Sequence, residues 1–358
     1  MKVLQLIDSL NPGGAERVAV NYANSLSKRI EGSYLCATRE EGLLKESLSK
    51  NVRYLFLNKK STLDLKAIRK LSRYIKINSV EIIHAHASSF FMASMIKLLN
   101  PKLILIWHEH YGNREQTSLK SKLVLKICSQ FFSAVIAVND SLKTRSERKL
   151  LSKNAYMLSN YPIINSELKA TKLHGESGKR IVCLANLRPD KDHINLLNVF
   201  KQVHTSYPDW SLHLVGKFNN DEYYGSIKTF IENEDLEKHV FIYGSCSDTF
   251  NILKQSTMGV LASKSEGLPL ALLEYGLAKL PVIATNVGDC QKVISNNEEG
   301  LLVEPKNYQV FAEALLTLIN DIELRRIVAQ NLHTKVLYDF SESRIVESLI
   351  NIYKTHYK

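Results

Sequence analysis

Short apolar runs of strand length alternate along the first half of the chain with longer segments in which apolar residues recur every three or four positions. The runs predict strands at Val3–Ile7, Ser33–Ala37, Val52–Leu57, Ile82–Ala85, Leu103–Trp107, Ala134–Val138 and Ala155–Leu158. Between them, Leu65, Ile68, Leu71 and Ile75 have the spacing of a helix with one buried face. This alternation predicts a parallel sheet that is covered by helices on both faces.

The same pattern begins again in the second half. Residues 160–162 and the polar stretch at 166–179 predict a linker. The strands expected after it are Ile181–Ala185, Leu212–Val215, Val240–Tyr243, Gly259–Ala262, Val282–Ala284 and Leu301–Val303. We therefore expect an α/β protein with two doubly wound domains, residues 1–165 and 166–340, and a C-terminal helix at 341–358.

The composition is that of a globular protein. The chain has 358 residues, of which 45% are hydrophobic, and this excludes a mainly disordered protein. No apolar stretch approaches the ~20 residues of a membrane-spanning helix. Asp8 interrupts the first apolar run, so no signal peptide is predicted. The five cysteines form no C-x-x-C pair, which argues against a disulfide scaffold or structural zinc. We expect a cytoplasmic protein.

The net charge of +11 lies in one half of the chain. Residues 1–165 carry 26 Lys and Arg against 12 Asp and Glu, whereas residues 166–358 carry 21 against 24. A basic excess on one domain suits a solvated surface, an anionic membrane, nucleic acid or a phosphorylated substrate. Because no nucleic-acid-binding module is recognised, nucleic acid is not predicted as a partner.

Two loops carry residues that suit a phosphorylated sugar ligand. Gly13 and Gly14 lie between the first strand and a helix, where the backbone can approach a ligand and the helix N–H groups favour a phosphate. In the second half, Glu266 lies on a loop before a helix, and Glu274 lies more than one turn into that helix. Carboxylates accept hydrogen bonds from the vicinal hydroxyls of a sugar or a ribose.

Four motifs carry a family resemblance: NPGGAERV from residue 11, EGLPLALLE from 266, LPVIATNVGD from 280 and EGLLVEP from 299. In order and over nearly the whole chain, they resemble glycosyltransferase family 4. The resemblance implies two Rossmann-like domains that face each other across a cleft, the B-type fold. It also implies transfer of a sugar from a nucleotide-diphosphate donor, UDP-sugar or GDP-mannose, with retention of configuration.

The resemblance implies roles for individual residues. Glu266 matches the catalytic glutamate at the donor sugar hydroxyls, and Glu274 matches the one that binds the ribose. Donor binding is implied for Gly13, Gly14, Glu266, Gly267, Leu268 and Glu274.

A basic pair of the family is only partly matched. Lys191 stands at the lysine that holds the donor diphosphate. Asn186 occupies the usual arginine position, so we expect Arg188, two residues on, to take that role. Asp190 and Asp192 have the D-x-D spacing of metal sites, but Lys191 lies between them and Asp192 is expected to cap a helix. No metal and no cofactor are predicted.

Histidines follow two strands of the first domain, as the pairs His84/His86 and His108/His110. The family has a histidine near the reacting sugar, and His110, just before residues 111–112, matches it best. His108 is the alternative, since the two are expected to alternate in direction.

Three residues depart from the family pattern. Lys279 stands where a glycine is usual, Asp289 where a second glycine is frequent, and Lys292 where a glutamate is common. These departures affect the expected identity of the donor more than the activity.

We expect a retaining hexosyltransferase of surface-polysaccharide synthesis (lipopolysaccharide, capsule or exopolysaccharide). Its acceptor would be a glycan or a lipid-linked glycan. The basic first domain would lie peripherally on the anionic inner face of the cell membrane, and the C-terminal helix would cross back to that domain. A non-catalytic partner subunit of the same fold and a sugar-nucleotide epimerase are the alternatives.

Overall fold

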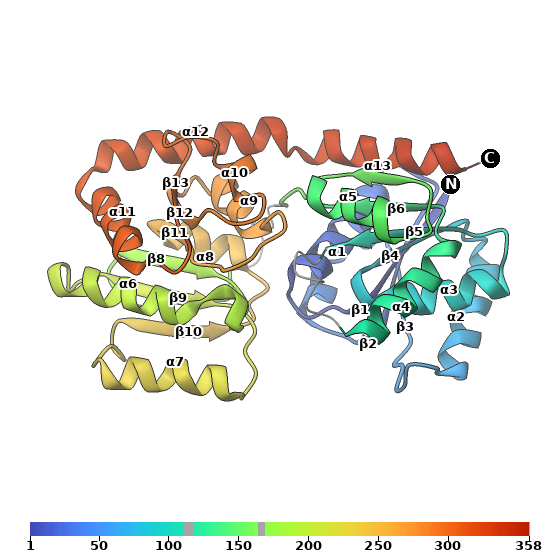
Figure 1. The fold of residues 1–358 in the computed structure, drawn as a ribbon, viewed down its shortest axis with the longest axis horizontal. Coiled ribbons are helices and arrows are strands. Elements are labelled where there is room, and N and C mark those ends of the chain that lie inside the picture. The colour runs from blue at the N-terminus through green and yellow to red at the C-terminus, as the bar shows by residue number, and fades with distance from the viewer. Residues whose placement is uncertain (111–117, 164–168, 358) are drawn as a thin grey trace. The chain divides into compact units, whose positions relative to one another are not determined.

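The computed structural model describes residues 1–110, 118–163 and 169–357, which form two compact units (Figure 1). The first unit contains Met1–Tyr161 together with Glu342–Lys358, and the second contains Pro162–Ser341. The division expected at residue 165, part of the expected linker and residues 111–112 beside His110 lie outside the described residues.

The first unit is built on a parallel sheet with the strand order β3-β2-β1-β4-β5-β6-β7. Its strands are β1 (Lys2–Ser9), β2 (Gly32–Glu40), β3 (Arg53–Phe56), β4 (Ile82–His86), β5 (Ile104–Glu109), β6 (Ala134–Ala137) and β7 (Ala155–Met157). Its α-helices are α1 (Gly14–Leu26), α2 (Leu65–Asn78), α3 (Phe90–Leu99), α4 (Leu119–Cys128), α5 (Asp140–Lys149) and α13 (Glu342–His356).

Successive residues of β1 face opposite sides of this sheet, because side chains alternate along a strand. Leu4 and Leu6 pack into the core that α2, α3 and α4 cover. Ile7 packs with residues of α1 on the other side. Gln5 shares that side, where its hydrogen bonds reach β4 and Tyr353 of α13. A polar layer therefore lies beneath α1 and α13.

The second unit repeats the architecture, with the strand order β10-β9-β8-β11-β12-β13. Its strands are β8 (Arg180–Leu184), β9 (Ser211–Val215), β10 (Val240–Gly244), β11 (Met258–Leu261), β12 (Val282–Thr285) and β13 (Leu301–Val303). Its α-helices are α6 (His193–Ser206), α7 (Glu222–Asn233), α8 (Thr249–Gln255), α9 (Leu270–Leu277), α10 (Cys290–Val293), α11 (Tyr308–Asn320) and α12 (Ile322–Asp339).

Tyr275 fixes helix α9 to the second sheet. Its hydroxyl accepts a hydrogen bond from the Leu184 N–H at 2.7 Å and donates to the Val260 carbonyl at 3.1 Å. The ring covers Gly259, where a Cβ would lie 2.7 Å from it. The start of α9, and with it the loop before the helix, is thereby held at the carboxyl end of β11.

The predicted fold class is confirmed: both units are parallel α/β sheets covered by helices. In each sheet the first strand lies in the middle, next to the fourth, and the chain order reverses there. Ligands of such sheets bind beyond the carboxyl ends of the strands at this reversal. In the second unit, that point lies between β8 and β11. Among the described residues, no helix combines the length and the hydropathy needed to cross a bilayer.

Candidate functional site

In the second unit, the loops after β8 and β11 bring Lys191 and Glu266 together. Lys191 ends a short 3-10 helix, η5 (Pro189–Lys191), and its Nζ lies 2.6 Å from Glu266 Oε1. Ser263, just after β11, donates its hydroxyl to the same carboxylate oxygen at 2.6 Å. The two charged side chains are only 15% and 8% exposed. A partly buried cation and carboxylate thus meet where the sheet reverses.

Gly288 explains how the Glu266 loop keeps its position. The Asp289 N–H donates to the Gly267 carbonyl at 2.9 Å, which ties the two loops together. Gly288 has φ +57, and a Cβ there would lie 2.2 Å from the Glu266 carbonyl oxygen. Only glycine combines this backbone conformation with so close an approach. The glycine of the NVGD motif therefore shapes the loop that carries Glu266.

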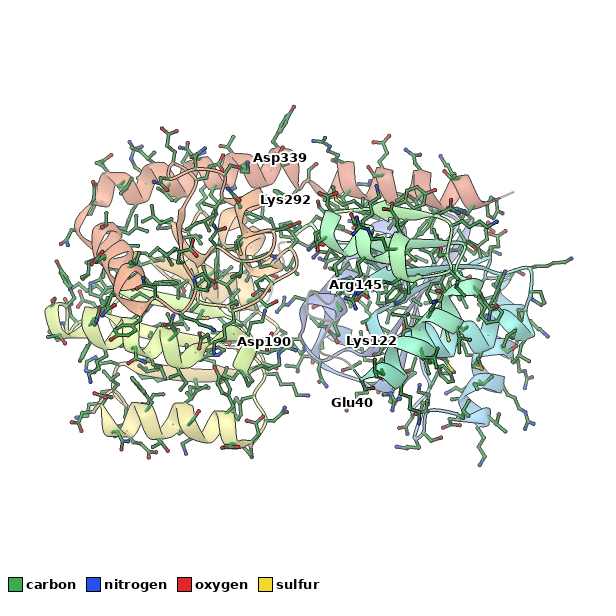
Figure 2. All side chains as sticks on the ribbon, viewed as in Figure 1. Glu40, Lys122, Arg145, Asp190, Lys292 and Asp339 are labelled. Carbon is green, nitrogen blue, oxygen red and sulfur yellow. The ribbon has the colours of Figure 1, made fainter. Side chains whose placement is uncertain are left out.

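The other residues predicted for this site lie around the pair. Arg188, exposed on the same loop, forms an ion pair with Asp190 at 3.3 Å rather than with Glu266 (Asp190 is labelled in Figure 2). The Leu268 side chain is buried, and Glu274 lies half-buried on α9. Asn186, at the usual arginine position, accepts a hydrogen bond from the Lys217 N–H at 2.9 Å, which is a structural role.

Both aspartates of the D-x-D motif form ion pairs with basic side chains. Asp190 pairs with Arg188, and Asp192 Oδ1 lies 2.9 Å from Lys264 Nζ. Asp192 occupies the N-cap position of α6, but its side chain accepts no capping hydrogen bond from that helix. Its pairing with Lys264 accounts for this, so the expectation of a side-chain cap is wrong.

His193 follows directly and is fully buried. Burial, helped by the nearby Lys191 charge, lowers the pKa of His193 to about 4, so the imidazole stays neutral beside the Lys191–Glu266 pair.

Two departures from the family pattern are neighbours. Lys292 Nζ lies 2.9 Å from Asp289 Oδ2 on the first turn of α10. Each residue balances the charge of the other. Lys279 has φ +58 just after α9. That conformation favours glycine.

In the first unit, the Gly13-Gly14 loop opens α1. Gly13 is the N-cap residue with extended backbone, and the Glu16 side chain folds over it. Gly14 is exposed, and a Cβ there would meet no atom within 4 Å. The backbone at Gly14 is therefore open to a ligand.

A polar cluster at the carboxyl ends of β1, β2 and β4 was missed from the sequence. Asp8, at the end of β1, accepts hydrogen bonds from the hydroxyls of Thr38 and Ser88 at 2.5 and 2.6 Å. Arg39 Nε lies 3.8 Å from the same carboxylate. The signal was available, since each of these residues follows or ends a predicted strand.

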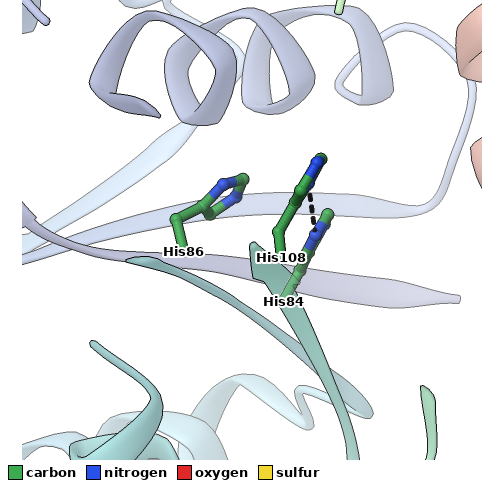
Figure 3. A group of neighbouring side chains, drawn as sticks. All are labelled: His84, His86 and His108. Carbon is green, nitrogen blue, oxygen red and sulfur yellow. Dashed lines mark hydrogen bonds between the residues drawn. The ribbon is translucent and has the colours of Figure 1, made fainter. Parts of the chain in front are cut away.

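Histidines of β4 and β5 form a hydrogen-bonded network in the polar layer (Figure 3). Strand register places Gln5 opposite His84 and His86 opposite His108. His84 Nδ1 lies 2.7 Å from the Tyr353 hydroxyl, and its Nε2 lies 3.2 Å from His108 Nδ1. His86 Nε2 lies 2.7 Å from Gln5 Oε1, and its Nδ1 lies 3.0 Å from His110 Nε2.

The orientation of the Gln5 amide sets the proton positions along this network. Gln5 Nε2 donates to the Tyr353 hydroxyl at 3.4 Å, so its Oε1 faces His86 and accepts from Nε2–H. The His86 Nδ1 lone pair then accepts from His110 Nε2–H. When His110 is neutral, its basic nitrogen is therefore Nδ1. Gln5 and Tyr353 were not predicted from the sequence.

Burial keeps the inner histidines neutral. It lowers the pKa of His84 to about 3 and holds those of His86 and His108 well below the ordinary value. His84, His86 and His108 offer nitrogens within 4.8 Å of one another. The His84 and His108 rings are parallel within 1° and their facing nitrogens share a hydrogen bond, whereas His108 Nε2 is buried without a hydrogen-bond partner among the described residues. The other five ring nitrogens of these three histidines are all engaged in hydrogen bonds, so the residues form a hydrogen-bonded network.

The expectation that His108 and His110 alternate in direction is wrong. Two positions apart on a strand, they share a face, and their rings stack with centroids 4.1 Å apart. His108 is fully buried, whereas His110 is half-buried at the strand end. Of the two, His110 is the one that can meet a ligand.

Two family models together match most of the chain. The model described as Glycosyltransferase Family 4 matches residues 12–155, and the model described as Glycosyl transferases group 1 matches residues 165–334.

Relatives and solved structures agree with these matches. The UDP-Gal:alpha-D-GlcNAc-diphosphoundecaprenol alpha-1,3-galactosyltransferase of Escherichia coli is 25% identical over 95% of this chain and 93% of its own. The capsular polysaccharide biosynthesis glycosyltransferase CapH of Staphylococcus aureus is 25% identical over 82% of this chain and 83% of its own. Anabaena HepE, solved with UDP and glucose, superposes with a TM-score of 0.83 at 19% identity, over 99% of both chains.

Proposed function

The chain belongs to the family 4 glycosyltransferases of the B-type fold, and from this premise we propose that it transfers a sugar from a nucleotide-diphosphate donor to a lipid-linked glycan acceptor in surface-polysaccharide synthesis. The Lys191–Glu266 contact of 2.6 Å is the observation that carries this proposal. It provides a cation for the diphosphate and a carboxylate for the sugar hydroxyls at one point.

Lys191 and Glu266 would each bind a different part of the donor because they carry opposite charges. A diphosphate that approaches Lys191 competes with Glu266 for the ammonium, which can donate three hydrogen bonds. As the glycosidic bond breaks, Lys191 stabilises the charge that develops on the diphosphate. Ser263 holds Oε1 of Glu266, and the other carboxylate oxygen can accept from a sugar hydroxyl. Arg188 joins the diphosphate once it releases Asp190, and Glu274 binds the ribose.

We propose a retaining, front-face reaction without a metal. Arg188 and Lys191 supply the positive charge that a metal would supply elsewhere, and Asp190 and Asp192 are paired with cations. His110 lies near the reacting sugar, and the backbone at Gly13 and Gly14 meets the donor phosphates. UDP is the proposed nucleotide, since the Escherichia coli relative is named for UDP-Gal and HepE is described with UDP.

We also propose peripheral binding to an anionic membrane through α4. Leu119, Leu123 and Ile127 are 84%, 59% and 50% exposed, and their i, i+4, i+8 spacing forms one apolar stripe. Lys120 and Lys126 lie on the same helix. Flotation with phosphatidylglycerol vesicles at physiological salt tests this part, and the absence of binding contradicts it.

Nucleotide binding tests the core of the proposal. A ligand that binds only the folded chain raises its melting temperature. UDP, and a UDP-sugar more so, should stabilise the chain, and Lys191→Gln should remove the effect. Lys238→Gln, an exposed change in the second unit, is the matched control.

Turnover separates an enzyme from a non-catalytic partner subunit. Glu266→Gln should keep UDP binding but lose transfer to a lipid-diphosphate-linked acceptor. The parent protein should transfer the sugar equally well with and without a chelator. NMR of the product should show the anomeric configuration of the donor. An inverted product contradicts the retaining mechanism, and full transfer by Glu266→Gln contradicts the role of Glu266.

A further inference from the structure

Two basic segments that lie apart in the sequence line one cavity in the first unit. Helices α4 and α5 contribute to a cavity of about 410 Å³, within the range of about 300–1,000 Å³ of small-ligand sites. Its charged lining residues are Lys122, Lys126, Arg145, Arg148, Lys149 and Glu109. Lys122 and Arg145, one from each helix, are labelled in Figure 2. The cavity therefore has a strong positive excess.

Three of these lining cations have no ion-pair partner among the described residues. Glu147 of α5 pairs with Lys143 at 3.8 Å, away from the lining. Within the described part of the chain, Lys126, Arg145 and Arg148 form no ion pair, and Arg145 Nη1 is buried without a hydrogen-bond partner. A guanidinium keeps its protons at any working pH, and a buried donor without an acceptor is costly. A phosphate oxygen in the cavity would satisfy it.

The rest of the lining is apolar. Trp107, Leu125 and Leu142 are buried at the cavity, and Leu123 joins it to the exposed stripe of α4. An inorganic anion would leave these surfaces uncovered, and a flat bilayer surface would not enter this half-open cavity. A single anionic amphiphile matches both the charges and the apolar area.

We propose that this cavity binds the diphosphate and the first isoprenoid carbons of a lipid-linked acceptor. The role of this lipid as the acceptor rests on the proposed function. Arg145 and Arg148 bind the diphosphate with Lys126, and the side chains around Trp107 contact the carbons. The rest of the lipid chain lies along the apolar stripe of α4 and extends into the bilayer.

Trp107 reports on this cavity directly. The chain has two tryptophans, so the full-length Trp210→Phe variant leaves Trp107 as the only one. Its fluorescence is followed while farnesyl diphosphate, farnesol or inorganic diphosphate is added. We expect saturable binding of farnesyl diphosphate and at least about tenfold weaker binding of the other two. Arg145→Gln and Arg148→Gln should each weaken farnesyl diphosphate binding about tenfold or more. Arg69→Gln, an exposed change on α2, should not.

Several results would overturn the proposal. The proposal is wrong if Arg148→Gln binds farnesyl diphosphate as tightly as its parent does. Because Arg148 is exposed, this result does not depend on whether Arg145→Gln folds. If the parent does not bind farnesyl diphosphate, and the arginine variants lose binding to phosphatidylglycerol vesicles, the cavity residues contact the bilayer instead. If farnesyl diphosphate binds but neither UDP nor a UDP-sugar stabilises the chain, the cavity site is supported and the proposed function is contradicted. If UDP stabilises the chain but farnesyl diphosphate does not bind, only the cavity site is contradicted.

Discussion

Lowering the pH from 7.5 to 5.0 should destabilise the first unit more than the second. Burial holds the pKa of His84 at about 3 and those of His86 and His108 well below the ordinary value. In the second unit, it lowers the pKa of His193 to about 4 and that of His213 to about 3. An unfolded histidine has a pKa of about 6.5.

The sign follows from proton binding. Between pH 6.5 and the folded pKa, the unfolded chain binds protons that the folded chain excludes, so stability falls as the pH falls. At pH 5.0, each such histidine lowers the free energy of unfolding by about 2 kcal/mol. These three histidines should cost the first unit about 6 kcal/mol, and these two should cost the second about 4 kcal/mol. Burial also lowers the pKa of His356 in the first unit and of His204 in the second, so one further histidine adds to the loss of each unit. The larger loss is comparable to the whole stability of many domains, about 5–15 kcal/mol.

Each unit carries its own reporter. Trp107 is buried in the first unit and Trp210 in the second. Urea unfolding is followed by fluorescence in Trp210→Phe and in Trp107→Phe, at several pH values from 7.5 to 5.0. The pH slope for the first unit should correspond to about three protons at pH 5.0 to 5.5.

Matched variants test the assignment. His86→Gln should reduce the slope of the first unit by about one proton, while His174→Gln, an exposed change in the second unit, should leave it unchanged. A first unit whose unfolding free energy changes by less than about 1 kcal/mol over this range would refute the reasoning.

Three further predictions concern individual residues. Gln5→Met removes the acceptor of the His86 network, so nitrogen-15 NMR of labelled protein should show His110 leaving the Nε2–H tautomer; an unchanged His110 signal contradicts the proton assignment. Gly288→Ala should destabilise the second unit by about 1–3 kcal/mol in urea unfolding and weaken UDP binding, because its Cβ meets the Glu266 carbonyl; wild-type values for both would falsify this. Lys279→Gly should stabilise the second unit by about 0.5–1 kcal/mol by removing a left-handed lysine. Lys228→Gly, inside α7, should instead destabilise it by about 1 kcal/mol.

The fold could be predicted because its signals are local. Each strand is a short apolar run, and alternation with amphipathic helices fixes a parallel sheet with little ambiguity. The motifs implied a donor-binding role for Lys191 and another for Glu266, 75 residues apart, but the contact between the two side chains was not predicted. Ser263 and Gly288 were not assigned roles there, because their function depends on how two loops meet in space.

The histidine network shows where prediction from the sequence ends. The pairs at β4 and β5 were noticed, but their partners Gln5 and Tyr353 carry no distinctive signal. Tyr353 lies 269 positions from His84, and one hydrogen bond joins them. The misjudged directions of His108 and His110 had a simpler cause, since residues two apart on a strand share a face.

The place of α13 has a consequence for how the chain is made. The polar layer of the first unit is closed by Tyr353, which is fully buried, and Glu342 of α13 also forms an ion pair with Arg29, just after α1. During synthesis the whole second unit emerges before α13 does. Until α13 is made, the polar layer of the first sheet is therefore covered by α1 alone, and the helix that follows the second unit completes the cover.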